Sequence, residues 1–250
     1  MGHPDPRSRF RVPVSGVLGA SVLTPGHPRL WQGFELFFRP WLQSRLQGIH
    51  LAGLPAPASL GPGPLILSAN HVSWFDGFLV REAQRHLRPR ALFRTLMLAS
   101  ELERSRMLRA LGGIGFDPER PLSLRRPLRT LAGLRTAGLV VAFFPQGRIY
   151  PSFRRPLGFE PGLELLSRTL SPCTVVGLGL HLEPGNQVRS RAYVHGTTPL
   201  KVPGGQGAQV SRVEEEIHRA LDHVHDHLAR WGEEAWTRWP TDPGDALPGT

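Results

Sequence analysis

LILSANHVSWFD, residues 65–76, joins an apolar run to a polar turn. The run from Leu65 has the length of a buried strand, and the turn places His71 five positions before Asp76. On one continuous helix five residues rotate through roughly 500°, so the two side chains would point about 140° apart. They can meet only if the chain turns between them. Because Asp is a good helix cap, we expect a strand that ends near Asn70 and a helix that begins near Asp76.

A histidine and an aspartate brought together in such a turn form a candidate acid–base pair. The ordinary pKa of histidine lies near neutrality, and a carboxylate on one ring nitrogen fixes the tautomer and steadies the imidazolium. His71 would then accept a proton from a hydroxyl, with Asp76 as its partner. The alternative is that His71 is a structural residue whose ring satisfies hydrogen bonds within the turn.

Three further segments follow this stretch along the chain. They read GGIGFD over residues 112–117 with Arg120 nearby, FPQGR over residues 144–148, and TVVGL over residues 174–178. Together with Asn70-His71-x4-Asp76, and in this order, they resemble the four sequence blocks of the glycerolipid acyltransferase family. That family includes the 1-acylglycerol-3-phosphate acyltransferases and other lysophospholipid acyltransferases, whose blocks usually contain NHxxxxD, FPEGTR and VPVxI. The resemblance covers residues 45–200.

The resemblance implies an enzyme of phospholipid synthesis that moves a fatty acyl group from acyl-CoA or acyl carrier protein to a hydroxyl of a lysophospholipid, by default lysophosphatidic acid. His71 would be the general base and Asp76 its orienting partner. The hydroxyl would attack the thioester directly, so no acyl-enzyme, metal or cofactor is implied beyond the thioester co-substrate. The residues implied in binding the acceptor are Asn70, Arg120, Gln146, Gly147 and Arg148.

The third and fourth blocks depart from the family pattern. Gln146 replaces the usual Glu, Arg148 stands at the Thr position, and Ile149 stands at the Arg position. A glutamine donates and accepts hydrogen bonds but carries no charge, so an altered preference for the acceptor head group is expected. Val176 replaces the proline of the fourth block, which we expect to form an apolar wall for the acyl chain. Two alternatives stay open: acylation of a non-phosphate amphiphile such as a glycolipid, and a catalytically inactive basic membrane-binding module.

Composition limits the class of protein. The chain has 250 residues, of which 40% are apolar, and this suits one large α/β domain. Its formal net charge is +10, which favours anionic membranes, phosphate-bearing donors or nucleic acid as partners. No nucleic-acid-binding motif accompanies the arginines, so we expect no nucleic-acid partner. Cys173 is the only cysteine and is expected to be a buried core thiol.

The chain divides into four predicted parts. Residues 1–27 are expected to form a flexible leader, 28–47 an amphipathic, membrane-associating helical segment, 48–235 the α/β acyltransferase domain, and 236–250 a flexible tail. Residues 28–47 carry one aromatic face, which suits the membrane interface but also suits a helix that covers the sheet of the same domain. No long apolar stretch or secretory signal is evident, so we expect a cytoplasmic protein bound peripherally to the inner face of the cell membrane.

Strand, polar turn and helix alternate along the predicted domain. This rhythm indicates an α/β fold with a mostly parallel or mixed central sheet covered by helices, preceded by the amphipathic helical segment. The clearest helical pattern covers residues 211–231. His223 and His227 are spaced four apart there, but no third metal ligand is evident, so we interpret the histidines of this helix as a solvated polar face. The predicted strands cover residues 49–54, 65–68, 90–94, 139–144, 173–180 and 192–195, and the other predicted helices cover 77–87, 101–111 and 122–137.

Overall fold

Eight strands form one mixed sheet in the order β1-β7-β6-β2-β5-β3-β4, with β8 paired to β6. The structure is a computed structural model that describes residues 24–117, 119–136, 138–186 and 188–248. Pairing is parallel from β6 through β2, β5, β3 and β4, and β7 joins β6 in antiparallel fashion. The predicted α/β fold is confirmed. The strands are β1 Leu46–Ala52, β2 Leu65–Ala69, β3 Leu92–Leu98, β4 Gly113–Phe116, β5 Leu139–Phe143, β6 Cys173–Glu183, β7 Ser190–Gly196 and β8 Leu200–Val202.

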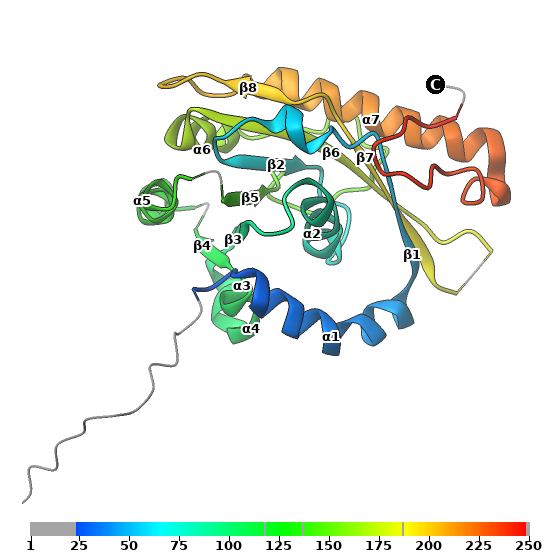
Figure 1. Ribbon diagram of the computed structural model, residues 1–250, viewed down its shortest axis with the longest axis horizontal. Helices are drawn as coiled ribbons and strands as arrows, with labels where there is room; N and C mark the ends of the chain where they lie inside the picture. Colours follow the sequence, from blue (N-terminus) through cyan, green and yellow to red (C-terminus); the bar gives the residue numbers. More distant parts are fainter. Residues whose placement is uncertain (1–23, 118, 137, 187, 249–250) are drawn as a thin grey trace, which may run out of the picture.

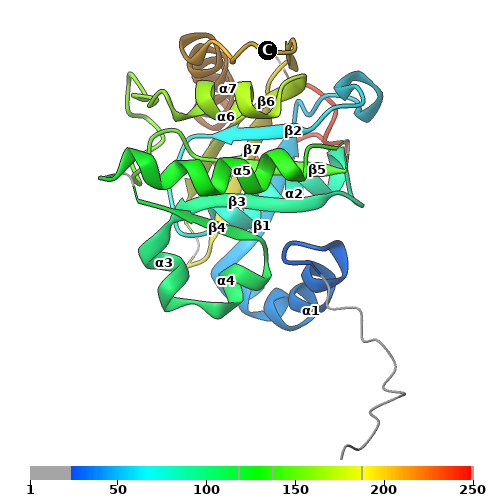
Figure 2. The same cartoon turned by 90° about the vertical axis from the view of Figure 1, so that its left-hand side faces the viewer.

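Helices cover both faces of this sheet (Figure 1 and Figure 2). Helices α1 and α2 lie on one face, whereas α5, α6 and α7 lie on the other. None of the helices in the described ranges is long and apolar enough to cross a bilayer. The helices are α1 Pro28–Arg45, α2 Asp76–Leu87, α3 Ala99–Arg104, α4 Arg106–Ala110, α5 Arg125–Gly133, α6 Gly162–Leu170 and α7 Val210–Trp231.

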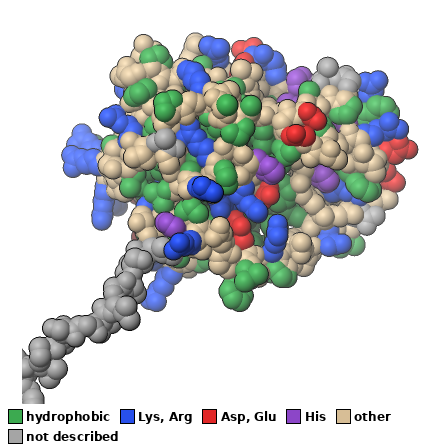
Figure 3. Space-filling view, in the orientation of Figure 1, with side chains coloured by type: hydrophobic (Ala, Val, Ile, Leu, Met, Phe, Trp, Pro, Cys, Tyr) green, Lys and Arg blue, Asp and Glu red, His purple; other side chains and the backbone are tan. Residues whose placement is uncertain are grey.

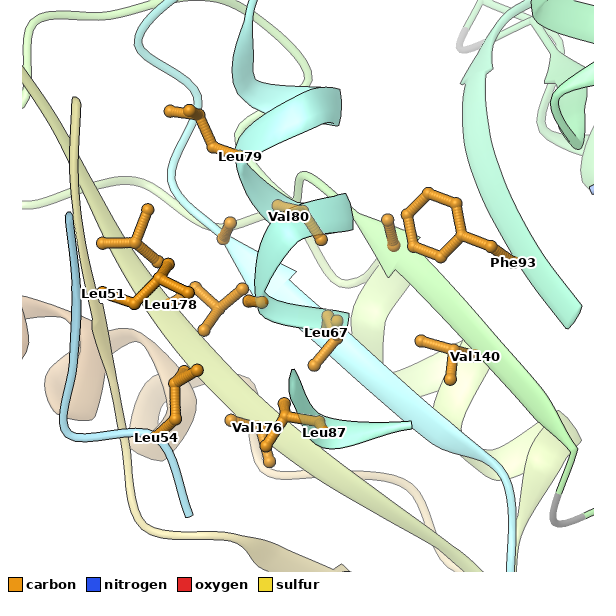
Figure 4. Close-up of a cluster of buried hydrophobic side chains, with 14 of the residues drawn as sticks. Leu51, Leu54, Leu67, Leu79, Val80, Leu87, Phe93, Val140, Val176 and Leu178 are labelled. Atoms are coloured by element: carbon orange, nitrogen blue, oxygen red, sulfur yellow. The ribbon is translucent and has the colours of Figure 1, made fainter. Parts of the chain in front are cut away.

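Strand β2 lies at the centre of the sheet and divides its side chains between two cores. It pairs in parallel with both β5 and β6, and all five of its residues are buried. Leu67 packs with the apolar face of α2, including Leu79 and Val80 (Figure 4). Ile66 points to the opposite face and packs with α6 and α7. This alternation follows from the two-residue period of a strand, and it explains why the run at 65–69 has no polar face.

Strands β4 and β8 are absent from the sequence-based prediction, and two further elements differ from it in their bounds. The helix predicted over residues 101–111 is broken at Ser105, whose hydroxyl accepts a hydrogen bond from the backbone N–H of Leu108 and caps α4. Strand β3 begins at Leu92 and continues to Leu98, beyond the predicted segment 90–94. Both differences lie at the ends of elements, where the spacing of apolar residues carries little information.

Helix α1 uses its aromatic face to cover the domain. Trp31 is buried, and its indole N–H donates to the carbonyl oxygen of Leu111. Phe34 and Phe38 stack on Phe78 of α2, with ring centroids 6.1 and 4.5 Å apart. The structure therefore supports the sheet-covering alternative for this face. Helix α1 also continues through Pro40, a residue that usually interrupts a helix because it lacks the backbone N–H.

The tail is packed against β1, so the prediction of a flexible segment over 236–250 is corrected for the described residues up to 248. Trp239 and Leu247 are buried, and the indole N–H of Trp239 donates to the carbonyl oxygen of Leu51. The backbone N–H groups of Gly53 and Leu54 donate to the carbonyl oxygens of Asp245 and Pro243. The predicted leader lies outside the described residues up to residue 23. Its last part is packed, since residue 26 hydrogen-bonds to residues 93 and 110.

Three histidines of α7, His218, His225 and His227, are buried or half-buried, which corrects their interpretation as a solvated face, whereas His223 is exposed. His227 is buried, and its Nε2–H donates to the carbonyl oxygen of Ala235 at 2.9 Å. The ring of His223 lies 5.4 Å from the ring of His195 on β7. Burial, with a smaller contribution from His223, lowers the pKa of His195 to about 4. His195 is therefore neutral in the folded protein at neutral pH.

This lowered pKa predicts acid-sensitive stability. Between the ordinary value of 6.5 and a folded value of about 4, the unfolded chain binds a proton that the folded protein excludes. The free energy of unfolding should therefore decrease as the pH is lowered through this window, by about 3 kcal/mol in total for this group. Urea denaturation at pH 7.5 and 4.5 measures the change. His195→Gln should show a smaller pH dependence, whereas His86→Gln on α2 should keep that of the wild type; equal dependence in His195→Gln and wild type would contradict the assignment.

Candidate active site

The predicted acid–base pair lies beside the carboxyl ends of β2 and β5. These neighbouring strands are parallel, but the chain leaves β2 into α2 on one face of the sheet and leaves β5 toward α6 on the other. Connections that diverge in this way open a crevice at the carboxyl edge, where α/β proteins commonly bind ligands. The turn 70–76 and the loop 144–161 meet there.

Asp76 organises the turn. Its side chain is fully buried, and Oδ2 accepts hydrogen bonds from His71 Nδ1 at 2.6 Å and from the backbone N–H groups of Val72 and Ser73 at 2.6 and 3.0 Å. The Ser73 hydroxyl donates to Oδ1 at 2.6 Å. Asp76 is the first residue of α2, so it does not cap the helix as a preceding residue. Its carboxylate instead points back into the turn, and these donors offset the desolvation of the charge.

His71 presents one ring nitrogen outward. Because Nδ1–H donates to Asp76, Nε2 carries the free lone pair. No described residue hydrogen-bonds to this Nε2, and the side chain is 26% exposed. The ring also stacks on Phe144, with centroids 4.8 Å apart. The geometry is that of a base whose tautomer and orientation are both fixed.

Gln146 holds the backbone of His71. Its Oε1 accepts from the backbone N–H of His71 at 2.7 Å, and its Nε2–H donates to the carbonyl oxygen of Leu157 at 2.9 Å. The backbone N–H of Tyr150 donates to the carbonyl oxygen of His71 at 2.8 Å. Gln146 is only 6% exposed. Its amide is therefore occupied within the protein, which corrects the expectation that it contacts the acceptor.

Asn70 joins β2 to β6. Its amide donates to the carbonyl oxygen of Leu180 at 3.0 Å and accepts from the backbone N–H of Leu180 at 2.7 Å. Since Ala69 is paired with Leu178, the side chain continues the strand ladder by one position where the backbone of β2 turns away. Asn70 is 1% exposed. It supports the turn, as expected, but offers no group to a ligand.

Gly147 and Arg148 form the exposed tip of the loop beside His71. Gly147 has φ of 63°, a conformation that favours glycine, and a Cβ added there would meet nothing within 4 Å. Among the described residues, no acidic group forms an ion pair with Arg148. Farther along the loop, the guanidinium of Arg154 lies 3.6 Å from the ring centroid of Tyr150, whereas Arg155 is paired with Asp222 at 2.6 Å.

The second block lies away from the His71–Asp76 pair, whereas the fourth block lies in β6, the strand next to β2. Arg120 follows β4, and its side chain is 83% exposed and 3.6 Å from the carboxylate of Asp117. Two strands separate β4 from β2, so their ends are roughly 14 Å apart at the usual strand spacing. Val176 is fully buried within β6 and belongs to the core rather than to an open wall. The fold therefore brings the third block to the first, leaves the second block three strands away, and buries the fourth block in the strand beside β2.

Other candidate functional features lie outside the His71–Asp76 site or are absent from the described residues. Cys173 is buried, and burial raises the pKa of its thiol to about 11, so it is a core residue as expected. No group of three or more metal-ligating side chains occurs among the described residues. An open groove of about 500 Å³ lies between the start of α6 and the start of α7, and Phe159, Glu164 and Ser211 line it. It does not border His71, and the divergence of the connections after β2 and β5 is the stronger indication of the site.

The chain matches no protein-family model, and no curated protein matches it significantly.

The bridging position of Gln146 yields a stability prediction. A glutamate there would keep one oxygen for the His71 N–H but would turn its second oxygen toward the carbonyl oxygen of Leu157, leaving two acceptors without a proton between them. Gln146→Glu should therefore lower the free energy of unfolding by roughly 1–3 kcal/mol. Urea denaturation at pH 7.5 measures this, with Gln32→Glu on the exposed side of α1 as the control. Wild-type stability in Gln146→Glu would show that the amide does not bridge the two segments.

Proposed function

We propose that this protein is an acyltransferase that moves a fatty acyl group from an acyl thioester, acyl-CoA or acyl carrier protein, to a hydroxyl of a lysophospholipid. The observation that carries the proposal is the His71–Asp76 pair, with Nδ1 held by a buried carboxylate and Nε2 free at the crevice. The resemblance of residues 70–76 and 144–148 to the glycerolipid acyltransferases supports the same reaction.

The proposed reaction uses His71 twice. Nε2 takes the proton of the acceptor hydroxyl as its oxygen forms a bond to the thioester carbonyl carbon. The tetrahedral intermediate then collapses, the C–S bond breaks, and the imidazolium returns the proton to the departing thiolate. Asp76 stabilises the imidazolium between these steps. The acyl group passes directly to the acceptor, so no residue of the protein becomes acylated.

Removing the base tests this proposal. His71→Ala should reduce acceptor-dependent turnover by roughly 10²- to 10⁴-fold, because proton transfer by a positioned base is lost. Asp76→Asn should also reduce turnover, since a neutral amide does not steady the imidazolium. Steady-state thiol release from an acyl thioester in the presence of a lysolipid measures both variants. His86→Ala, which alters a partly exposed histidine of α2, is the control, and wild-type turnover in a folded His71→Ala variant would refute the mechanism.

We infer that the protein is cytoplasmic and binds peripherally to the inner face of the cell membrane through the outer side of α1. Leu36 and Phe37 are 73% and 83% exposed, and apolar side chains protrude over α1 at the lower edge of Figure 3. Trp41 lies next to Trp74 of the catalytic turn, with ring centroids 5.7 Å apart, and Arg45 lies over Trp41 at 5.8 Å. Apolar side chains flanked by arginine and connected to the site suit an anionic bilayer that also delivers the acceptor.

This assignment places the membrane contact on the exposed side of the helix and not on the aromatic face, whose Trp31 is buried. Leu36→Ser combined with Phe37→Ser should weaken binding to anionic vesicles about tenfold or more, because each large apolar side chain withdrawn from water contributes roughly 1.5–3 kcal/mol. Co-sedimentation with vesicles measures the change. Leu165→Ser, on α6 at the opposite face of the sheet, is the matched control. Equal binding by the double variant and wild type would exclude this surface.

The acceptor is proposed to carry a phosphate, since Arg148 is exposed beside His71 and has no acidic partner among the described residues. Arg148→Ala should raise KM for a phosphorylated acceptor about tenfold or more, because a charge-assisted hydrogen bond contributes roughly 1.5–3 kcal/mol. Kinetics with matched phosphorylated and dephosphorylated acceptors measure the effect, with Arg104→Ala on α3 as the control. Equal losses with both acceptors would show that Arg148 does not recognise phosphate and would favour a neutral acceptor such as a glycolipid.

A further inference from the structure

The hydroxyl of Ser152 lies between two histidines from different elements. Ser152 Oγ is 2.7 Å from Nδ1 of His181 on β6 and 3.3 Å from Nε2 of His225 on α7. The two imidazole rings meet edge to face, with centroids 4.9 Å apart. Ser152 is 7% exposed. No sequence pattern indicates this cluster, because His181 and His225 lie 29 and 73 residues from Ser152 along the chain.

The hydrogen bonds of this cluster fit one protonation state. Nε2 of His181 lies 3.3 Å from a carboxylate oxygen of Glu183, so its proton belongs there and Nδ1 accepts from the Ser152 hydroxyl. The Ser152 Oγ then also accepts a hydrogen bond from Nε2–H of His225. With both rings neutral, each polar atom facing Ser152 has a complementary partner.

Positive charge is disfavoured in this cluster. Burial lowers the pKa of His181, and the Glu183 carboxylate opposes that effect only in part. Burial, then His181 and Arg155, lower the pKa of His225, whereas Asp222 and Asp226 raise it to a smaller extent. The phenol of Tyr193 on β7 also faces His181, with ring centroids 6.4 Å apart. A proton on either imidazole would place a cation beside the other ring and beside Arg155, which donates to the Ser152 carbonyl oxygen at 2.8 Å.

The cluster is connected to the His71–Asp76 pair along two short paths. Two residues before Ser152, the backbone N–H of Tyr150 donates to the carbonyl oxygen of His71. One residue before His181, the backbone of Leu180 holds the amide of Asn70. The position of Ser152 therefore constrains the loop segment that supports His71 from one side, while β6 supports the turn from the other.

We propose that Ser152, His181 and His225 form a proton-operated latch that positions His71: when both histidines are neutral the latch holds Tyr150 against His71, and protonation releases the 149–155 segment. Ser152 is a positioning residue and does not touch the reacting atoms. The consequence for acyl transfer rests on the proposed function, since release would remove support from the base. The latch itself is a property of the fold and is testable without any substrate.

Hydrogen exchange of backbone amides in residues 149–155 tests the latch. After correction for the intrinsic pH dependence of exchange, wild-type protection should fall roughly tenfold or more between pH 7.5 and 5.5, because the open state binds the protons that the closed state excludes. The informative variant combines His181→Asn, whose amide replaces Nδ1, with His225→Gln, whose amide replaces Nε2. It keeps hydrogen-bonding groups at Ser152 but does not titrate, so its protection at pH 5.5 should stay close to its value at pH 7.5.

Three comparisons complete the experiment. Ser152→Ala, which engages neither ring, should exchange fast at both pH values. His86→Gln should behave as wild type. His71→Ala should retain the pH-dependent release, which separates the latch from titration of the proposed base. The proposal is overturned if wild-type protection does not change with pH, if the double variant loses protection as wild type does, or if Ser152→Ala remains protected. Failure of acyl transfer with an intact exchange pattern would count against the proposed function alone.

Discussion

The buried carboxylate of Asp76 is the charge on which the site depends. Removing such a charge from water costs several kcal/mol unless close donors replace the lost hydration. Four hydrogen bonds from the turn supply that replacement, and they require the chain to fold back between His71 and Asp76. This electrostatic requirement therefore fixes where β2 ends, where α2 begins and how the imidazole is oriented. The start of α2 adds a favourable helix dipole at the carboxylate.

Two buried side-chain amides connect this turn to neighbouring elements of the fold. Asn70 connects the turn to β6 through Leu180, and Gln146 connects it to the loop after β5 through Leu157. Each needs one donor and one acceptor, which a carboxylate does not provide. Gln146 therefore explains one departure from the acyltransferase pattern by the structure of the loop, without reference to the charge of an acceptor. Under the proposed function, recognition of a charged acceptor would fall to the exposed tip at Arg148.

Sequence predicts the parts of this protein that are governed by local pattern. The strand–turn–helix at 65–87 was predictable because period, turn residues and the His71–Asp76 spacing lie within a single short segment. Long-range contacts were not predictable. The aromatic stripe of α1 indicated that one face is covered, but not that α2 covers it, and Leu247 in the tail carries no pattern that reports its packing on β1. The cluster at Ser152 likewise joins segments that only the three-dimensional fold brings together.

The same geometry gives one proton acceptor a fixed place at the crevice, with a basic loop tip on one side and an apolar helix surface near the other. The measurement that tests this arrangement most directly is the dependence of thiol release on the acceptor, using acyl-CoA and acyl carrier protein donors with and without a panel of lysolipids and glycolipids. Release that requires a hydroxyl acceptor, with formation of its acyl ester, is the expected result. Thioester hydrolysis that ignores the acceptor, or no thioester consumption with any donor, would contradict the assignment of His71 as the base of an acyltransferase.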